Sequence, residues 1–265
     1  MSTAITEQVQ VHDADNVRWI TLDRPASRNG LTMDVVERLI ELFDDAATNS
    51  DVRVLVLHGA NGAFCSGLDL KAAASLALGG GSTDTSFGMK RFHDLVRALQ
   101  NIAKPTIASV DGAAAGFGCD LALGCDLRIG SARARLGERF VRIGLMPDGG
   151  GTYFLPRLVG RAKALELIYE GRMVESEEAV QLGLLNKLFD SEGFEAAVQT
   201  YAAGLAKGPP LSYAASKRAV LGADGTLETS LRLEAEGQLQ LLNTADFMEG
   251  VQAFLTKRPP NFIGQ

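Results

Sequence analysis

The feature that most constrains the fold is a glycine-rich stretch from Lys104 to Thr152. It begins with an apolar run, Thr106 to Val110, which predicts a buried strand that ends at Asp111-Gly112. Small residues follow, and Cys119 to Leu123 has the pattern of the first turns of a buried helix. The start of a helix leaves backbone N–H groups without intrahelical acceptors, and these suit an anion or a developing oxyanion. The same pattern also fits a tight crossover that needs small residues for close packing.

Two further segments extend this pattern. Gly62 to Leu70 follows another apolar strand, predicted at 52–58, and offers a second glycine turn with a free N–H group. Two N–H groups that converge on one carbonyl oxygen form an oxyanion hole. The third segment, Gly144 to Gly151, places the carboxylate of Asp148 in an apolar, glycine-rich turn that opens a helix. The three segments therefore predict a site built from backbone donors and a carboxylate.

In this order and spacing the segments resemble the crotonase (enoyl-CoA hydratase/isomerase) superfamily. The resemblance runs from Leu22-Asp23-Arg24-Pro25 to Ala253–Arg258 and so covers almost the whole chain. It implies an α/β fold, a crotonase-like spiral of repeated β-β-α units over 1–192, which would hold the CoA and acyl site. An all-helical oligomerisation region is expected over 193–265, giving a homotrimer or a dimer of trimers. The hydrophobic pattern agrees, since it predicts helices alone at 194–207, 210–222, 226–243 and 244–256.

The resemblance also implies roles for individual residues. The family holds a thioester carbonyl so that an enolate can form, and the matching donors here are the N–H groups of Leu68 and Phe117. Asp148 stands where isomerase-type members carry their acid/base, and Asp120 stands at the first of two carboxylate positions that hydratases use. The second of these positions holds Phe140, which cannot transfer a proton. The residues implied in CoA and substrate binding are Arg24, Arg28, Ala63, Leu68, Asp69, Leu70, Lys71, Phe117 and Phe140, with Phe254 and Lys257 from a neighbouring subunit.

Each of these assignments has a plainer alternative. Asp148 could cap the helix that follows it, and Asp120 could assist the chemistry or only cap. Arg24 and Arg28 could be solvated loop charges. Glu138 is a candidate substitute carboxylate, but strand alternation puts it on the same face as Phe140. We therefore expect Glu138 to be a surface or subunit-contact carboxylate.

The lead prediction for activity is an isomerase that converts 3-enoyl-CoA to 2-enoyl-CoA, or a related ring isomerase, with Asp148 as the proton shuttle. One carboxylate suffices for this reaction, because burial raises its pKa toward that of the proton it moves. Phe140 and the run from Gly144 to Asp148 resemble the branch that serves aromatic-acid degradation. The alternatives are an enoyl-CoA hydratase that uses Asp120 and Asp148, an acyl-CoA hydrolase, and a non-enzymatic acyl-CoA-binding paralogue.

Composition narrows the class of protein. A hydrophobic content of 46% and a charged content of 22% are typical of a globular protein, and a net charge of −6 argues against a nucleic-acid surface. No apolar run reaches the ~18 residues of a membrane span, and the N-terminus lacks a signal pattern, so a cytoplasmic location is expected. The three cysteines match no zinc spacing, so neither a metal nor a cofactor is expected, coenzyme A being part of the substrate. The segment 72–87 is expected to be a flexible loop that flanks the acyl pocket.

Overall fold

The structure is a computed structural model that describes residues 3–72, 74, 85–223 and 225–265. The centre of the segment 72–87, which the sequence assigns to the border of the acyl pocket, lies outside these residues. No helix in the described part of the chain is long and apolar enough to cross a membrane.

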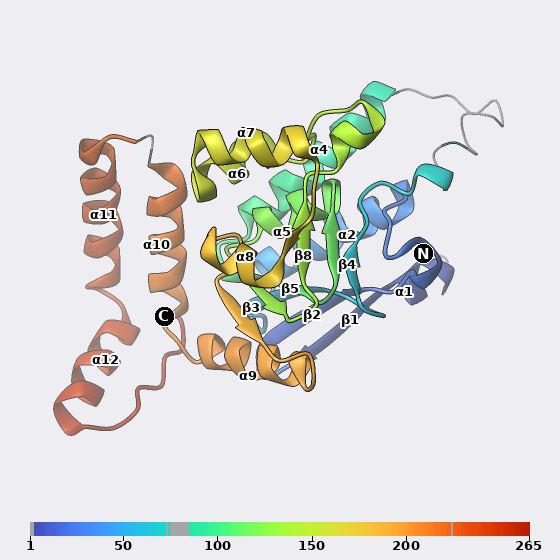
Figure 1. Cartoon of the computed structure of the whole chain (residues 1–265). Coiled ribbons are helices and arrows are strands. Elements are labelled where there is room, and N and C mark those ends of the chain that lie inside the picture. Colours follow the sequence, from blue (N-terminus) through green and yellow to red (C-terminus); the bar gives the residue numbers. More distant parts are fainter. Residues whose placement is uncertain (1–2, 73, 75–84, 224) are drawn as a thin grey trace.

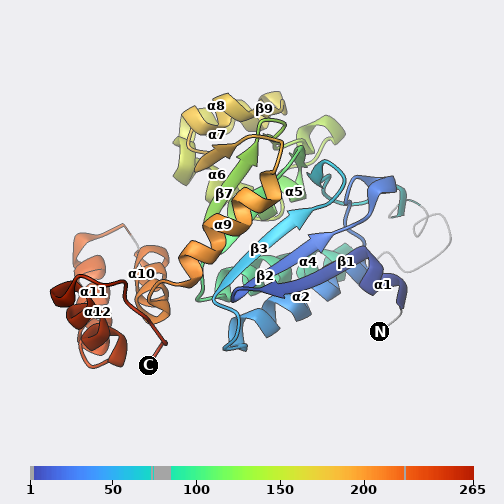
Figure 2. The ribbon, with the colours of Figure 1, turned by 90° about the horizontal axis from the view of Figure 1, so that it is seen from below.

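Two β-sheets organise the core (Figures 1 and 2). The larger has the strand order β1-β2-β3-β5-β7-β10 and is parallel except for the β1–β2 pair. The smaller has the order β4-β6-β8-β9. The strands of the larger sheet are β1 (Val9–Ala14), β2 (Val17–Leu22), β3 (Val54–Gly59), β5 (Thr106–Val110), β7 (Leu127–Ser131) and β10 (Lys187–Phe189), and those of the smaller are β4 (Ala63–Cys65), β6 (Ala113–Ala115), β8 (Arg135–Gly137) and β9 (Val174–Glu175).

The predicted spiral of β-β-α units is confirmed. The pairs β3–β4, β5–β6 and β7–β8 each run from the larger sheet into the smaller one within a few residues, and α4 (Thr85–Asn101) and α5 (Phe117–Gly124) follow the first two pairs. The turn between β5 and β6 requires glycine at Gly112, whose φ is +86° and where a Cβ atom would lie 2.0 Å from the carbonyl oxygen of Gly62. The sequence predicted β5 correctly but assigned 113–115 to a turn, because three alanines carry no strand pattern.

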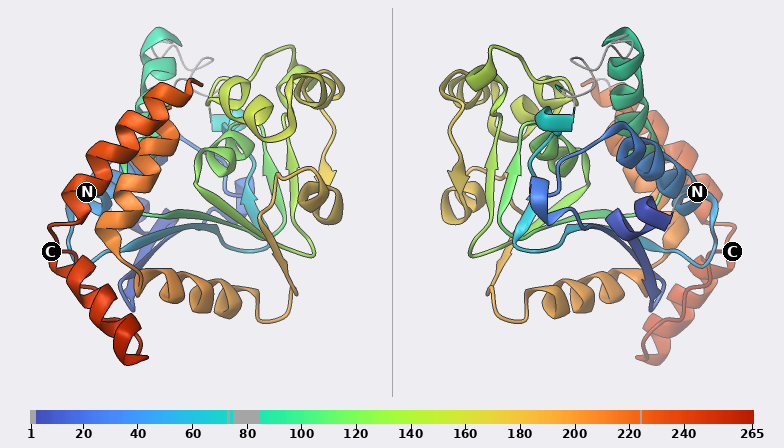
Figure 3. Two further views of the ribbon diagram at one scale, coloured as in Figure 1. Left: turned by 90° about the vertical axis from the view of Figure 1, so that its left-hand side faces the viewer. Right: turned by 90° about the vertical axis from the view of Figure 1, so that its right-hand side faces the viewer.

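Both faces of the larger sheet are buried. Side chains of β2 and β3 alternate, so that Ile20 and Leu57 join the cluster that contains α2 (Met33–Thr48) and α4, whereas Trp19 and Val56 join a second cluster. Figure 3 shows α9 (Phe194–Ala206) on the face opposite α2 and α4, where it supplies the other half of the second cluster. Trp19 is thus a packing residue, and its Nε1 donates to Oε1 of Gln199 at 2.6 Å.

The remaining helices extend the core on two sides (Figure 1). Near the smaller sheet lie α6 (Gly151–Val159), α7 (Arg161–Glu170) and α8 (Ser176–Gln181), and α1 (Thr3–Gln8) lies beside β1. Helices α10 (Pro210–Gly222), α11 (Leu227–Leu241) and α12 (Ala245–Thr256) stand to one side of the sheets. Lys217 on α10 joins them to the core, since its Nζ donates to Oδ2 of Asp126 at 2.7 Å. The division at 192/193 stays a prediction, and α9 packs on the core sheet although it follows that boundary.

A buried arginine gives a test of the last turn of the spiral. Arg128 on β7 donates to the carbonyl oxygens of Leu184 (2.7 Å) and Cys125 (2.8 Å), so Arg128→Met leaves both buried oxygens unsatisfied. We expect the free energy of unfolding to fall by about 2–4 kcal/mol, measured by urea denaturation. The matched control is Arg133→Met. The Arg133 side chain is 59% exposed in its ion pair with Asp111, so this substitution should lower the free energy of unfolding by less than about 1 kcal/mol. Equal losses in the two variants would contradict this account.

Candidate active site

Two glycine turns meet at the edge of the smaller sheet. Strands β4 and β6 are parallel neighbours, so their carboxyl ends lie at the same edge. A Cβ atom at Gly67, which has a φ of +87°, would lie 2.9 Å from the carbonyl oxygen of Ala115 and 3.2 Å from the nitrogen of Phe117. Neither the N–H of Leu68 nor that of Phe117 has an acceptor among the described residues. The two donors implied by the sequence are therefore side by side and free to bind one oxygen atom.

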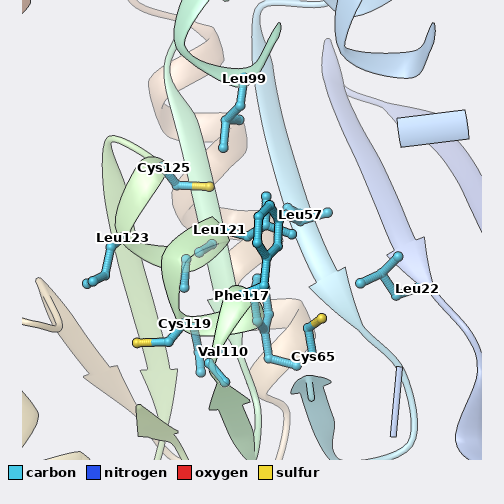
Figure 4. Close-up of a cluster of buried hydrophobic side chains, with 14 of the residues drawn as sticks. Leu22, Leu57, Cys65, Leu99, Val110, Phe117, Cys119, Leu121, Leu123 and Cys125 are labelled. Atoms are coloured by element: carbon cyan, nitrogen blue, oxygen red, sulfur yellow. The ribbon is translucent and has the colours of Figure 1, made fainter. Parts of the chain in front are cut away.

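The bulky side chain of Phe117 does not obstruct its own N–H group. It is buried in the core (Figure 4). There its ring meets the ring of Phe92 edge-on, with 4.7 Å between the ring centroids. The next residue, Gly118, must lack a side chain, because a Cβ atom there would lie 2.2 Å from the carbonyl oxygen of Cys65. Phe117 thus anchors the first turn of α5 while its backbone faces the glycine turn.

A carboxylate from each of two segments lies next to these donors. Asp120, in the first turn of α5, is fully buried, and its Oδ2 accepts the N–H of Gly149 at 2.8 Å. This bond ties α5 to the turn that carries Asp148. Asp148 is partly exposed, and its Oδ1 is buried without a hydrogen-bond partner among the described residues. Burial raises the pKa of Asp148, and the charge of His93 on α4 opposes that rise.

The expectation for Glu138 is wrong. Strand β8 ends at Gly137 and a 3-10 helix, η2 (Phe140–Ile143), begins two residues after Glu138, so strand alternation does not apply there. Glu138 is only 2% exposed and lies beside Asp120, as a Cβ atom at Gly151 would be 2.2 Å from Oδ1 of Asp120 and 2.8 Å from Oε1 of Glu138. Burial and the charge of Asp120 raise the pKa of Glu138 well above its ordinary value. Sequence pattern missed this residue because a three-residue strand is too short to define its faces.

Apolar side chains complete the surroundings of Asp148. Phe140 is buried, and its ring edge would be 3.8 Å from a Cβ atom at Gly116, in the second glycine turn. The loop before Asp148 exposes Leu145 (53%) and Met146 (66%). Asp120 and Glu138 are both buried, so neither offers a carboxylate that is open to solvent.

A groove of about 900 Å³ lies beside the first glycine turn. It brings together six of the residues implied in CoA binding, namely Arg24, Arg28, Leu68, Asp69, Leu70 and Lys71. Arg24 is held in an ion pair with Asp69 at 3.0 Å, so its charge is partly used within the protein. Arg28 is exposed in the groove.

Five of the implied residues do not line this groove, and two of them, Phe117 and Phe140, are described above. Ala63 is buried in β4, and its carbonyl oxygen accepts Nδ2 of Asn29 at 2.7 Å, so it supports the groove without lining it. Asn29 was missed by the sequence reasoning, although its φ of +61° is one that asparagine tolerates well. Phe254, 83% exposed on α12, and Lys257 just after it do not line the groove in the single chain, and their contribution to a neighbouring subunit stays a prediction.

The cysteines and His58 have side chains that could act as nucleophiles or metal ligands, but they are buried in the core. Burial raises the pKa of Cys65 and of Cys125 to about 12, and both are free thiols in the core (Figure 4). His58 is buried against Ser109, with 3.1 Å between Nδ1 and Oγ. Within the described ranges there is no group of three or more histidine, cysteine, aspartate or glutamate side chains that could hold a metal ion.

Known proteins match this chain over almost its whole length. The family model described as enoyl-CoA hydratase/isomerase matches residues 12–265. A protein named "Probable enoyl-CoA hydratase" from Rhodobacter capsulatus is 40% identical over 253 residues, which are 95% of this chain and 96% of that protein. The 1,2-epoxyphenylacetyl-CoA isomerase of Escherichia coli is 36% identical over 261 residues, 98% of this chain and 99% of that protein.

Solved structures agree with the sequence relatives. The crystal structure of an enoyl-CoA hydratase from Bacillus anthracis superposes with a TM-score of 0.92 at 31% identity, and the match covers 97% of this chain and all of that one. The sequence match spans the two glycine turns, the Asp148 segment and the C-terminal helices. The chain belongs to the enoyl-CoA hydratase/isomerase family, the crotonase superfamily.

Proposed function

We propose that this enzyme is an enoyl-CoA isomerase in which Asp148 moves a proton between two carbon atoms of the acyl chain. The observation that carries the proposal is the different accessibility of the carboxyl groups near the oxyanion turns. Asp148 is partly exposed, whereas Asp120 and Glu138 are closed off from solvent. Relatives bear both hydratase and isomerase names, so the choice rests on these residues.

The proposed reaction uses the two halves of the site in turn. The thioester oxygen of a 3-enoyl-CoA accepts hydrogen bonds from the N–H groups of Leu68 and Phe117. The carboxylate of Asp148 then removes a proton from Cα, and the electron pair moves onto the thioester oxygen as an enolate. The same carboxyl group returns the proton to Cγ, so the double bond moves into conjugation with the carbonyl group. The raised pKa of Asp148 makes the carboxylate a stronger base for the first step.

Hydration fits the site less well. It needs a positioned water and a second accessible proton-transfer group, and Phe140 occupies the second hydratase position. Asp120 is fully buried, and its Oδ2 already accepts the N–H of Gly149. The exposed side chains of Leu145 and Met146 offer an attacking water no acceptor stronger than a thioether sulfur.

The groove is the proposed binding place of the CoA moiety. Because the whole chain carries a net charge of −6, attraction of CoA phosphates has to come from local basic residues. Arg28 and Lys71 both line the groove, next to the Leu68 donor. In a proposed trimer or dimer of trimers, helices α10–α12 would form subunit contacts and bring Phe254 and Lys257 toward the groove of a neighbour.

Replacing Asp148 tests the proton shuttle. With 3-hexenoyl-CoA in D2O, the wild type should form the conjugated 2-enoyl thioester, followed by absorbance and by mass. Asp148→Asn should lower kcat by roughly 10²–10⁴-fold, because an amide cannot accept the Cα proton. The matched control is Glu177→Gln, an exposed carboxylate on α8, which should leave kcat unchanged.

The outcomes separate the candidate functions. Isomerisation that survives Asp148→Asn would contradict the proposal. Hydration of 2-enoyl-CoA that survives the substitution would point to Asp120 as the group that acts in the chemistry. Release of free CoA by the variant at the wild-type rate would indicate a hydrolase. Binding of acyl-CoA without deuterium exchange in the wild type would leave a binding protein.

A pair of glycines tests the oxyanion turns. Gly67→Ala should push the Leu68 and Phe117 turns apart, because the new methyl group would lie 2.9 Å from the carbonyl oxygen of Ala115. We expect kcat to fall by about 10²–10³-fold, the usual effect of losing an oxyanion donor. Gly62→Ala is the control, since its φ of +72° imposes similar backbone strain but its Cβ atom would meet nothing within 4 Å. Similar kcat values for the two variants would show that backbone strain, not the oxyanion turn, explains the loss.

A further inference from the structure

The buried carboxyl group of Glu138 has no role in the reaction as proposed so far. Both of its oxygen atoms are buried without a hydrogen-bond partner of ordinary geometry among the described residues, and so is Oδ1 of Asp120. An unsatisfied buried carboxylate is costly, and two adjacent ones are more so. A single proton placed between the two groups would satisfy Oδ1 of Asp120 and one oxygen of Glu138 together.

The geometry connects this pair to Asp148. Oδ1 of Asp120 and Oε1 of Glu138 both lie within 2.8 Å of the point that a Cβ atom of Gly151 would occupy, at the start of α6. The other oxygen of Asp120, Oδ2, accepts the N–H of Gly149, the residue after Asp148. A continuous path therefore runs from Glu138 through Asp120 to the turn that aims Asp148.

The other charged and titratable groups around Glu138 do not replace the shared proton. From α5, Cys119 is a buried thiol whose pKa burial raises well above its ordinary value, so it is neutral and can donate only a weak S–H hydrogen bond to Glu138. Asp148 adds negative charge, which further disfavours an ionised Glu138. Arg172 lines the small cavity of about 10 Å³ beside Glu138, but its guanidinium group is bound by Glu178 and Glu170. The adjacent Arg139 donates to the carbonyl oxygen of Gly171.

We propose that Glu138 is a positioning residue that stays a neutral acid and donates its proton to Oδ1 of Asp120. This bond fixes the Asp120 side chain, which in turn holds the N–H of Gly149 and thereby the direction of the Asp148 carboxylate. The effect on catalysis rests on the proposed function of Asp148, whereas the shared proton does not. The pair also keeps the negative charge next to Asp148 to one unit.

The shared proton has a consequence for stability that needs no substrate. A carboxyl group whose pKa is higher in the folded than in the unfolded chain contributes stability below its unfolded pKa, and this is lost as the pH rises through its folded pKa. Burial raises the pKa of both members of the pair, that of Asp120 to about 7 and that of Glu138 well above its ordinary value. The free energy of unfolding of the wild type should therefore fall as the pH rises above about 4.3, the ordinary value for glutamate.

The first experiment measures urea unfolding of the wild type and of Glu138→Gln from pH 5 to pH 8. The amide keeps a donor for Oδ1 of Asp120 but has no proton to lose, so the decline of stability with pH should be shallower in the variant by the contribution of one proton. Glu177→Gln, with its exposed side chain, should keep the wild-type slope. A Glu138→Gln slope equal to that of the wild type would overturn the shared proton.

The second experiment separates positioning from mere packing. Glu138→Met has a similar volume and no donor, so kcat for 3-hexenoyl-CoA should fall on the order of 100-fold, the effect of a misplaced catalytic group, while KM changes little. Glu138→Gln, which keeps a donor for Oδ1 of Asp120, should restore kcat to within a few-fold of the wild type.

Equal kcat values in the Gln and Met variants would overturn the positioning role, whether both are high or both are low. A wild type with no isomerase activity would contradict the proposed function of Asp148. In that case the pH slopes of unfolding would still test the shared proton by themselves.

Discussion

The site depends on the parallel pairing of two three-residue strands, β4 and β6. Because parallel strands end at the same edge, this pairing places the residues after Cys65 and after Ala115 next to each other. The approach is so close that glycine is required at both Gly67 and Gly118, where a Cβ atom would collide with backbone atoms of the other segment. Folding of the spiral and formation of the two donors are therefore one event, and the donors need no side chain of their own.

Burial then divides the work among three neighbouring carboxyl groups. Asp120 and Glu138 lie behind the turn that carries Asp148, in the region where α5, β8 and the start of α6 converge. Three negative charges in such a space would repel strongly, and burial makes each of them costlier. Exposure decides which group can meet a substrate, and only Asp148 among the three has it. The closed pair can instead support the turn from behind.

Much of this arrangement could be predicted from the sequence, for reasons that particular elements make clear. The bounds of β5 were predicted to the residue, because an apolar run and a glycine turn mark them. Helix α9 was predicted, but its packing on the larger sheet was not. Its buried residues include the small side chains of Ala202 and Ala206, which do not form an obvious apolar stripe. The short strands β4 and β6 were missed, and the strand assumed at Glu138 ends at Gly137, because pairing with distant segments, not local pattern, decides where these strands lie. Glu138 was misjudged for the same reason.

The identity of Phe117 shows why a backbone-built site can be recognised through its glycines. In the proposed site the N–H of residue 117 is an oxyanion donor, while its ring packs on Phe92 in the core, so the two demands act on different parts of one residue. At Gly67 and Gly118 the demands coincide, because the backbone of the neighbouring segment fills the space that a side chain would need. Substitution at position 117 should therefore mainly change the packing of the core, whereas substitution at Gly67 should mainly change catalysis. The glycines carry the functional signal in this chain, and the donors they position are free to vary with the core.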